Sequence, residues 1–381
     1  MEERPVWENR IKKATALLLA GMVLLLAALF FIMDKKEFSE NENRYLAKFP
    51  SMSLEGIKSG EYMSGLESYL ADHFPFRDFF MGIKTKAEMY AGKKKINGIY
   101  IAEDGYLIEA YEKPENTERI GQILGSFAKE LEGQDVDLCL MLVPTAIYVY
   151  GEKLPGRAPV RNQMETAEIV YSLSGIRAVD CSKDLFAYKE KGELYYKTDH
   201  HWTTLGAYAG YTAYCREMGL DAVALEEMEA QTVTEDFRGT VYSKAGDYGR
   251  EGDAITIYRN PADKLTVEYA DTGETSNSLY NLEYVDEKDK YSLFLDNLHS
   301  LIEITNENAD SDRELVLVKD SYANSMVPFL VHHYEKIYVF DTRYYKQGVS
   351  AFIKEHPEVT DVLLLYNMNT LDNDLGIRGV Y

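Results

Sequence analysis

The amino-acid sequence predicts an α/β fold in which a mostly parallel β-sheet is flanked by helices and preceded by one transmembrane helix. Two observations support this prediction. Near the C-terminus, three uniformly apolar runs alternate with helical stretches, which is typical of parallel strands whose two faces are both covered. Near the N-terminus, 20 residues from Ala14 to Met33 carry no charge. This is the length that a helix needs to cross about 30 Å of hydrocarbon.

The composition excludes several classes of protein. Of the 381 residues 46% are hydrophobic, so the chain has enough apolar matter for a core and is neither disordered nor collagen-like. With 41 basic and 63 acidic side chains the formal net charge is −22. We therefore expect no nucleic-acid partner, because binding to phosphates requires a basic face. Three cysteines allow at most one disulfide, which excludes a disulfide scaffold.

The apolar run at residues 14–33 has the features of an uncleaved signal anchor. It ends in Asp34-Lys35-Lys36 without the small residues of a cleavage site. Four basic residues precede the run, so the positive-inside rule places residues 1–13 in the cytoplasm as a short tail. The sequence therefore predicts a single-pass protein of the cell membrane with an extracytoplasmic C-terminal domain.

The elements that follow are read from periodicity and turn residues. Residues 34–95 predict a polar, helix-rich lead-in in which Pro75 separates two helices. Residues 97–109 contain two short alternating runs around an Asp-Gly turn, the pattern of a β-hairpin. A helix is expected at 117–132 and a buried strand at 136–144. A further strand is expected at 175–182 and a helix at 203–219.

The last part of the chain carries the strongest strand signals. Residues 222–312 alternate short strand-like runs with acidic loops, so we expect a strand-rich insertion there. The three apolar runs then follow at 313–321, 336–343 and 361–367, and helical stretches at 322–335 and 346–356 separate them. This order predicts parallel pairing with right-handed crossovers. The main domain is expected to cover residues 96–381.

Polar residues stand where these three runs end, and ligands of open parallel sheets bind at the carboxyl ends of the strands. The first run ends in Lys319-Asp320-Ser321, the second in Arg343 and the third in Asn367. A serine in a strand-to-helix turn can present its hydroxyl as a nucleophile beside backbone N–H groups. Serine is also a frequent helix cap, so a purely structural role for Ser321 stays open.

A second cluster lies far upstream, at Asp199, His200, His201 and Trp202. A carboxylate two residues from an imidazole can orient it as the base for a serine. Alternatively, Asp199 caps the next helix and the histidines are surface residues. A metal site is a third interpretation, because Asp and His are ligand types, but no further ligand stands at a recognisable spacing. We therefore expect no metal.

The segments TDHHWT at 198–203 and KDSYANSMVPFL at 319–330 resemble the bacterial DHHW protein family. That family is similar to the SGNH-hydrolase-like domain of the alginate O-acetylation proteins. The resemblance extends over most of the extracytoplasmic part, with further matches at 42–50, 67–78, 97–109 and 142–155. In the alginate proteins a D-x-H motif supplies the acid and base, and a serine lies far downstream. The resemblance assigns the D-x-H motif to Asp199 and His201, and the serine to Ser321.

The resemblance also implies an SGNH-like fold with a circularly permuted order, because D-x-H precedes the serine here. Ser321, Arg343 and Asn367 keep the order of the serine, glycine and asparagine blocks, which places Arg343 and Asn367 near the oxyanion. Lys319 departs from the Gly-Asp-Ser pattern and leaves the turn geometry open. The other residues expected to bind substrate are neighbours of these: His200, Trp202, Tyr322 and Asn324.

The function implied is that of a membrane-anchored extracytoplasmic serine enzyme acting on acyl esters. Residue identity does not separate an O-acetyltransferase from an acetylesterase, but the topology and the resemblance favour an O-acetyltransferase that acts on a cell-surface or exopolysaccharide glycan. Transfer would require a membrane partner that passes acyl groups outward. A non-catalytic glycan-binding or scaffold protein of a polysaccharide-modification system is the alternative. No organic cofactor is expected, because the sequence has no glycine-rich phosphate loop.

Overall fold

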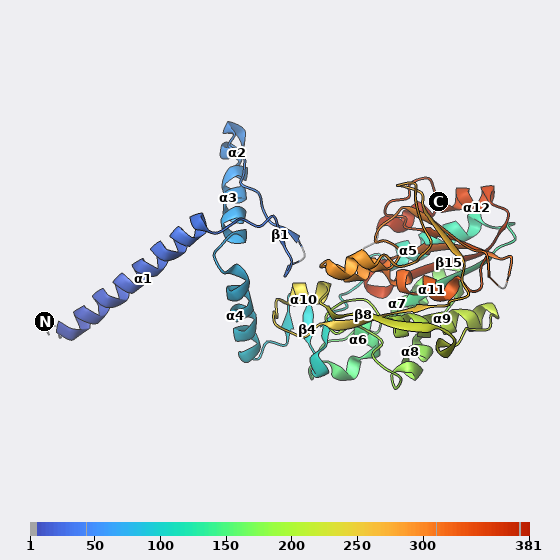
Figure 1. The fold of residues 1–381 in the computed structure, drawn as a ribbon, viewed down its shortest axis with the longest axis horizontal. Helices are drawn as coiled ribbons and strands as arrows, with labels where there is room; N and C mark the ends of the chain where they lie inside the picture. Colours follow the sequence, from blue (N-terminus) through green and yellow to red (C-terminus); the bar gives the residue numbers. More distant parts are fainter. Residues whose placement is uncertain (1–5, 43, 310, 373–374) are drawn as a thin grey trace. The chain divides into compact units, whose positions relative to one another are not determined.

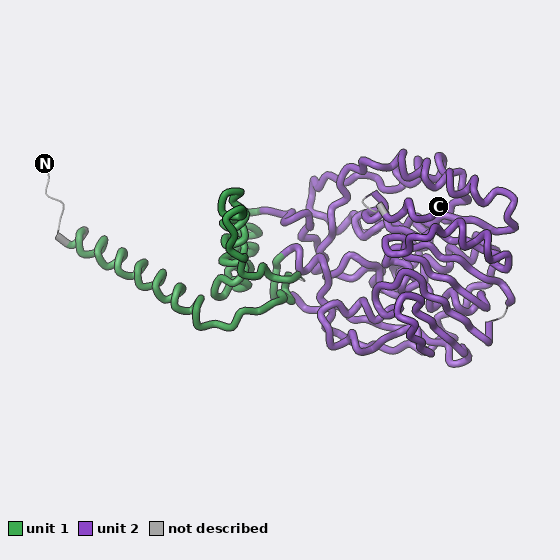
Figure 2. The backbone as a smooth tube through the Cα atoms, turned by 90° about the horizontal axis from the view of Figure 1, so that it is seen from above, with its two compact units in different colours: residues 1–92, 246–248 green, residues 93–245, 249–381 purple. Residues whose placement is uncertain are grey.

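The computed structural model describes residues 6–42, 44–309, 311–372 and 375–381. The chain divides into two compact units (Figure 2), one of residues 1–92 and 246–248 and one of residues 93–245 and 249–381. Residues 1–5 of the expected cytoplasmic tail lie outside the described part, as do residue 43 of the lead-in and residues 310, 373 and 374 of the main domain.

The first unit is mainly helical. Its elements are α1 (Val6–Ile32), β1 (Phe38–Ser39), β2 (Arg44–Tyr45), α2 (Leu54–Ser59), α3 (Glu61–Asp72) and α4 (Arg77–Tyr90). Within α1, Asn9–Ile32 are long and apolar enough to cross a membrane, with a mean hydropathy of 2.7. Pro75 lies between α3 and α4, as the sequence predicts, because a proline interrupts the hydrogen bonding of a helix interior.

The second unit contains an eight-stranded sheet (Figure 1). In sheet order its strands are β11 (Glu274–Ser276), β10 (Leu265–Tyr269), β12 (Leu301–Asn306), β14 (Lys336–Phe340), β13 (Glu314–Lys319), β15 (Val359–Asn367), β6 (Asp137–Val143) and β7 (Arg177–Ala178). The pairs from β14 through β13, β15 and β6 to β7 are parallel, and those from β11 to β14 are antiparallel. The prediction of an α/β fold with a mostly parallel sheet is confirmed.

The second unit also contains helices of different lengths. They are α5 (Thr117–Glu130), α6 (Ala146–Val149), α7 (Gln163–Ser174), α8 (Ser182–Tyr188), α9 (Thr204–Met218), α10 (Thr240–Ala245), α11 (Val327–Leu330), α12 (Val349–Glu355) and α13 (Met368–Leu371). Strands β13 and β15 are buried on both faces over almost their whole length. This explains why they are continuously apolar in sequence rather than alternating.

Two element predictions are wrong in extent. The helix expected at 322–335 is instead a 3-10 turn, Ser321–Ser325, followed by the short α11. Pro328 lies in the first turn of α11, where its missing N–H needs no partner, so the helix starts there instead of running through it. The strand expected at 175–182 is reduced to the two residues of β7, which pair only with the middle of β6.

Shorter strands complete the second unit. The hairpin expected at 97–109 is present: β4 (Ile99–Ile101) pairs antiparallel with β5 (Leu107–Glu109), and β3 (Lys95–Ile96) adds a third strand. Within residues 222–312, β8 (Glu229–Phe237) and β9 (Asp253–Arg259) form a two-stranded sheet of their own. Strands β10, β11 and β12 from the same stretch extend the main sheet on its antiparallel side.

Candidate active site

The turn that follows β13 presents Ser321 at the carboxyl end of the sheet. Asp320 caps this turn: its carboxylate accepts from the Tyr322 N–H at 2.9 Å, and from the backbone N–H and side-chain amide of Asn367, both at 2.7 Å. Burial raises the pKa of Asp320 to about 6, although the donors oppose the shift. Because Asn367 ends β15, this buried carboxylate joins two neighbouring strand ends and fixes the half-buried Ser321 between them.

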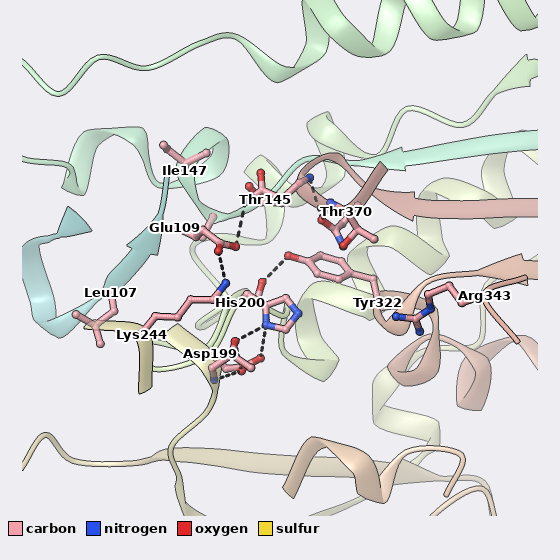
Figure 3. A pocket seen from close by; sticks show the side chains of 14 residues that line it. Leu107, Glu109, Thr145, Ile147, Asp199, His200, Lys244, Tyr322, Arg343 and Thr370 are labelled. Atoms are coloured by element: carbon pink, nitrogen blue, oxygen red, sulfur yellow. Dashed lines mark hydrogen bonds and ion pairs between the residues drawn. The ribbon is translucent and has the colours of Figure 1, made fainter. Parts of the chain in front are cut away.

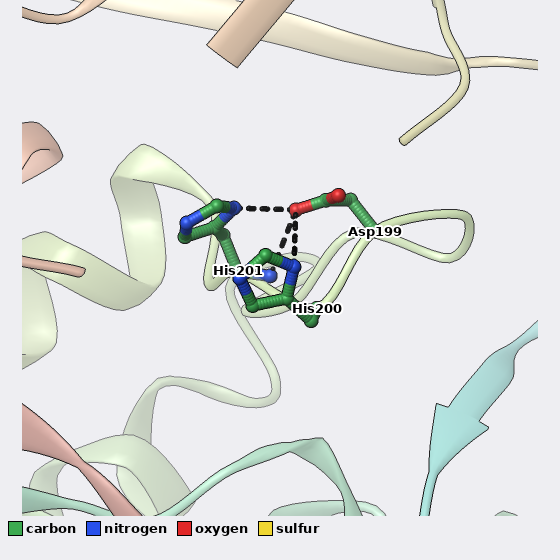
Figure 4. Close-up of side chains that lie close together, drawn as sticks. All are labelled: Asp199, His200 and His201. Atoms are coloured by element: carbon green, nitrogen blue, oxygen red, sulfur yellow. Dashed lines mark hydrogen bonds and ion pairs between the residues drawn. The ribbon is translucent and has the colours of Figure 1, made fainter. Parts of the chain in front are cut away.

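Asp199, His201 and Ser321 form one hydrogen-bonded chain. His201 Nδ1 lies 2.5 Å from Asp199 Oδ1, and His201 Nε2 lies 2.7 Å from Ser321 Oγ. Figure 4 marks the interaction between Asp199 and His201 with a dashed line. The Asp199 carboxylate also accepts from the His201 backbone N–H at 3.0 Å. The structure thus brings together, from positions 120 residues apart, the three side chains that the sequence singles out.

The carboxylate of Asp199 is held from its other side by the start of α10. Its Oδ2 accepts from the Thr240 N–H at 2.7 Å and from the Thr240 hydroxyl at 3.1 Å. A Cβ on Gly239 would lie 2.0 Å from this same oxygen, so only glycine fits at that position. Although burial disfavours the charged form, the imidazoles of His200 and His201 hold the pKa of Asp199 well below its usual value. Asp199 is therefore an anion in a fixed orientation.

The loop that carries Asp199 is fixed at both ends. On β9, Asp253 accepts from the N–H groups of Lys197 and Thr198 at 2.9 and 2.8 Å and from the Thr198 hydroxyl at 2.6 Å. At the other end, Thr203 caps α9 by accepting from the Gly206 N–H. Both anchors limit the movement of the two histidines between them.

His201 is packed as well as hydrogen-bonded. Its ring stacks on Tyr291 with centroids 3.7 Å apart and an interplanar angle of 8°. The Tyr291 hydroxyl lies 3.0 Å from the Ser321 carbonyl oxygen and 3.0 Å from Ser325 Oγ. Burial and the neighbouring His200 lower the pKa of His201 to about 4, against the opposing effect of Asp199. At neutral pH the imidazole is therefore uncharged and able to accept a proton.

A cavity of about 420 Å³ opens beside this chain (Figure 3). Asp199, His200 and Tyr322 form part of its wall. The Tyr322 hydroxyl donates to the His200 carbonyl oxygen at 2.5 Å. Glu109 from β5 and Lys244 from α10 also line the cavity, and they form an ion pair of 2.6 Å. The chamber is thus polar and charged on several sides. Ser321 and His201 are not among its lining residues, whereas their neighbours Tyr322 and His200 are.

Arg343 and Asn367 line the cavity, and each also stabilises a buried carboxylate. The Arg343 guanidinium makes two hydrogen bonds to the buried Asp341, at 2.9 and 2.5 Å. The Asn367 amide donates to Asp320 and to the Thr370 hydroxyl, both at 2.7 Å. Both N–H groups of the Asn367 amide are used in this way, so in this geometry Asn367 does not offer the oxyanion contact expected from the sequence. The two hydrogen bonds of Arg343 involve only its Nε and Nη2, and its expected contact with the oxyanion stays a prediction.

The Ser321 N–H has no hydrogen-bond acceptor among the residues that the structure describes. A backbone N–H at the nucleophile itself, at the start of a turn, is suited to hold an oxyanion. It is the donor that the geometry leaves available for that purpose.

Trp202 and Asn324, expected to contact substrate, do not line the cavity. Trp202 is fully buried, and its indole N–H donates to the Tyr322 carbonyl oxygen at 2.9 Å. It therefore supports the turn of Ser321 from the core, as is usual for a buried tryptophan that needs one polar partner. Asn324 is 3% exposed within the same turn.

Several residues of the site carry no signal in the sequence. Gly239, Thr240, Asp253 and Tyr291 all come from the stretch expected as an insertion, and Glu109 comes from the hairpin. None of them belongs to a motif of recognisable spacing. Their roles follow only from the fold, which brings α10, β9 and β5 around the loop of Asp199.

The cluster has the residue types of a metal site, since ligand atoms of Asp199, His200 and His201 lie within 4.8 Å of one another. Both ring nitrogens of His201 are hydrogen-bonded, to Asp199 and to Ser321. His200 Nδ1 lies 2.6 Å from the Thr240 hydroxyl. A metal ion would have to displace one of these partners, so the arrangement fits a proton relay better than a coordination shell.

A parallel sheet with a Ser–His–Asp chain at its carboxyl edge defines the class of this molecule as an SGNH-like α/β protein. The model of the DHHW protein family matches residues 117–340, and the chain therefore belongs to the DHHW protein family. The resemblance noted in the sequence is confirmed.

Comparison with solved structures agrees with this assignment. The crystal structure of a DHHW family protein from Eubacterium siraeum has a TM-score of 0.66 and 26% identity, over 75% of this chain and 95% of that chain. PatB1 from Bacillus cereus, in a structure with a sulfonyl adduct, has a TM-score of 0.61 and 20% identity, over 73% of this chain and 97% of PatB1. These likenesses confirm the fold.

Among curated proteins, the probable alginate O-acetylase AlgJ of Pseudomonas syringae pv. tomato is 22% identical to this chain over 173 residues. The match covers 43% of this chain and 44% of AlgJ. The chain thus spans less than half the length of this relative.

Proposed function

We propose that this protein is a membrane-anchored serine enzyme that transfers acyl groups to an extracytoplasmic glycan or hydrolyses them from it. The observation that carries the proposal is the Asp199–His201–Ser321 chain, with distances of 2.5 and 2.7 Å, beside a polar cavity. The similarity to a probable alginate O-acetylase supports the choice of acyl chemistry on a polysaccharide.

Asp199, His201 and Ser321 each have a defined part in the proposed reaction. His201 Nε2 takes the proton of Ser321 Oγ as this oxygen attacks the carbonyl carbon of an acyl ester. Asp199 accepts from His201 Nδ1–H and stabilises the imidazolium that forms. The Ser321 N–H holds the oxyanion. The imidazolium then protonates the leaving oxygen, the carbonyl re-forms, and the acyl group stays on Ser321.

The second half of the reaction decides between transfer and hydrolysis. His201 takes a proton from a sugar hydroxyl or from water as the oxygen of that group attacks the carbonyl carbon of the acyl-enzyme. The bond from this carbon to Ser321 Oγ breaks, and the imidazolium returns the proton to Ser321 Oγ. A sugar acceptor gives an O-acyltransferase and water gives an esterase. The apolar helix α1 would anchor the chain with its N-terminus in the cytoplasm. Acyl groups would come through a membrane partner.

The experiment uses the full chain in detergent, with p-nitrophenyl acetate as the donor and a sulfonyl fluoride as a label for activated serines. We expect Ser321→Ala and His201→Ala to abolish turnover, and mass spectrometry to locate the sulfonyl group on Ser321. Ser172→Ala and His356→Ala are matched controls, because Ser172 is exposed on α7 and His356 is paired with Glu358 at the surface. Both controls should keep full turnover.

Three results would contradict the proposal. Equal turnover in all variants would mean background hydrolysis and would favour a glycan-binding or scaffold protein. Turnover that is lost on chelation and restored by a divalent metal would favour a metal-dependent hydrolase built on Asp199, His200 and His201. A sulfonyl group on a serine other than Ser321 would assign the nucleophile elsewhere.

A further inference from the structure

The cavity lined by Asp199, His200 and Tyr322 has a charge pattern that selects its ligand. We propose that it binds an uncharged glycan rather than a polyuronate, and that Glu109 is the main acceptor of hydrogen bonds from the sugar hydroxyls. This inference rests on the proposed function, since it names the class of sugar that the same site would bind for acyl transfer or hydrolysis. It departs from what the name of the alginate-related protein suggests, because alginate is a polyanion.

Glu109 is held in place by groups from two other elements. Its Oε1 lies 2.6 Å from Lys244 Nζ on α10, and its Oε2 accepts from the Asn369 side-chain amide on α13 at 3.3 Å. Although partial burial opposes ionisation, Lys244 holds the pKa of Glu109 below its usual value. The carboxylate is therefore charged and oriented before a ligand arrives, which lowers the cost of binding. Each carboxylate oxygen keeps a further lone pair for a hydroxyl.

The lysine and arginine side chains of the cavity are already paired with carboxylates. Lys244 and Arg343 are the two Lys or Arg side chains among its described lining residues. Lys244 is paired with Glu109, and Arg343 with the buried Asp341. A uronate carboxylate would enter next to two anions, Glu109 and Asp199, without an unpaired cation to offset its desolvation.

The net charge of the whole protein also disfavours a polyanionic ligand. The formal net charge is −22, and such a field lowers the local concentration of polyanions near the site. An uncharged sugar is unaffected by this field. The volume of about 420 Å³ falls within the range of about 300–1,000 Å³ usual for small-ligand sites.

The test measures binding without turnover. The full chain carrying Ser321→Ala is placed in detergent, and its affinity is measured by calorimetry for cellotriose, xylotriose and chitotriose and, separately, for trigalacturonate. We expect at least one neutral trisaccharide to bind, and trigalacturonate to bind at least tenfold more weakly at low ionic strength.

Three variants in this background separate the role of Glu109 from general charge. Glu109→Gln should weaken the neutral sugar about tenfold, because it loses a charged acceptor. It should also strengthen trigalacturonate, because Lys244 loses its partner. Lys244→Met keeps the carboxylate and should weaken trigalacturonate further. The matched control is Glu112→Gln, three residues along, whose carboxylate is exposed and paired with Lys95; it should change neither affinity.

The inference is overturned if trigalacturonate binds as tightly as the neutral sugars, if none of the neutral sugars binds, or if Glu109→Gln behaves like Glu112→Gln. These outcomes are independent of the sulfonyl labelling of Ser321. Neutral sugar binding without labelling would leave the ligand class standing and remove the acyl chemistry. Sulfonyl labelling of Ser321 together with tighter binding of trigalacturonate would support the acyl chemistry and overturn the proposed ligand class.

Discussion

Replacement of Gly239 by alanine tests whether the position of Asp199 controls the reaction. The added Cβ would lie 2.0 Å from Asp199 Oδ2 and 2.4 Å from its Cγ, whereas such contacts do not fall below 3.0 Å in real structures. The carboxylate must therefore move by about 1 Å, which breaks its 2.5 Å hydrogen bond to His201. A displacement of this size costs about 10²-fold in rate, and loss of the orienting carboxylate in a serine triad costs about 10⁴-fold.

We therefore expect kcat for p-nitrophenyl acetate to fall by a factor between about 10² and 10⁴ in Gly239→Ala. The free energy of unfolding should fall by only about 1–3 kcal/mol, the usual cost of overpacking. The matched control is Gly151→Ala, because a Cβ there meets nothing within 4 Å. A thermal melt separates lost activity from lost fold. Turnover within twofold of wild type, in a folded variant, would refute the idea that Asp199 must be held where it is.

Three further predictions concern His201 and the groups packed around it. Burial lowers the pKa of His201 to about 4, and the neutral ring is the proposed base. We therefore expect kcat/KM to stay level from pH 7 to about pH 5 and to fall with a midpoint near pH 4. A midpoint near pH 6.5 would contradict this expectation. Trp202→Phe removes the 2.9 Å hydrogen bond to the Tyr322 carbonyl and leaves it only the 3.4 Å bond from Ser325 Oγ, so it should cost about 1–3 kcal/mol in the free energy of unfolding with KM unchanged. A raised KM would restore the substrate-contact role. Tyr291→Phe keeps the ring on His201 and should lower kcat far less than Tyr291→Leu, which removes the stacked ring; equal losses would show that the hydroxyl matters more than the ring.

The site shows how buried carboxylates fix a loop and a turn that carry the reacting groups. Asp320 joins Ser321 to the end of β15, Asp253 holds the loop of Asp199, and Asp341 holds Arg343. Each of these carboxylates is nearly inaccessible to solvent and makes two or more hydrogen bonds. Such groups are costly to bury unless they are fully bonded, so their bonding partners are fixed in direction. This accounts for the engagement of Arg343 and Asn367, which the sequence suggested as oxyanion donors.

The local sequence pattern is enough to predict the three central strands and to single out Asp199, His201 and Ser321. Continuous apolar runs identify β13, β14 and β15, because strands buried on both faces need apolar side chains at every position. Ser321 was found because ligands gather where such strands end, and Asp199 and His201 because a carboxylate beside an imidazole is a readable pattern. All of these signals lie within a few neighbouring residues.

The tertiary structure alone decided what surrounds those residues. Gly239 matters because a Cβ would meet Asp199, and Glu109 matters because Lys244, 135 residues away, pairs with it. Such contacts leave no mark on local composition, since any chain segment can supply one glycine or one carboxylate. Trp202 was misjudged for the same reason, because its proximity to the histidines in sequence does not tell on which side of the loop its ring lies. Sequence periodicity reports which face of an element is buried, and only the packing of distant elements decides which groups meet there.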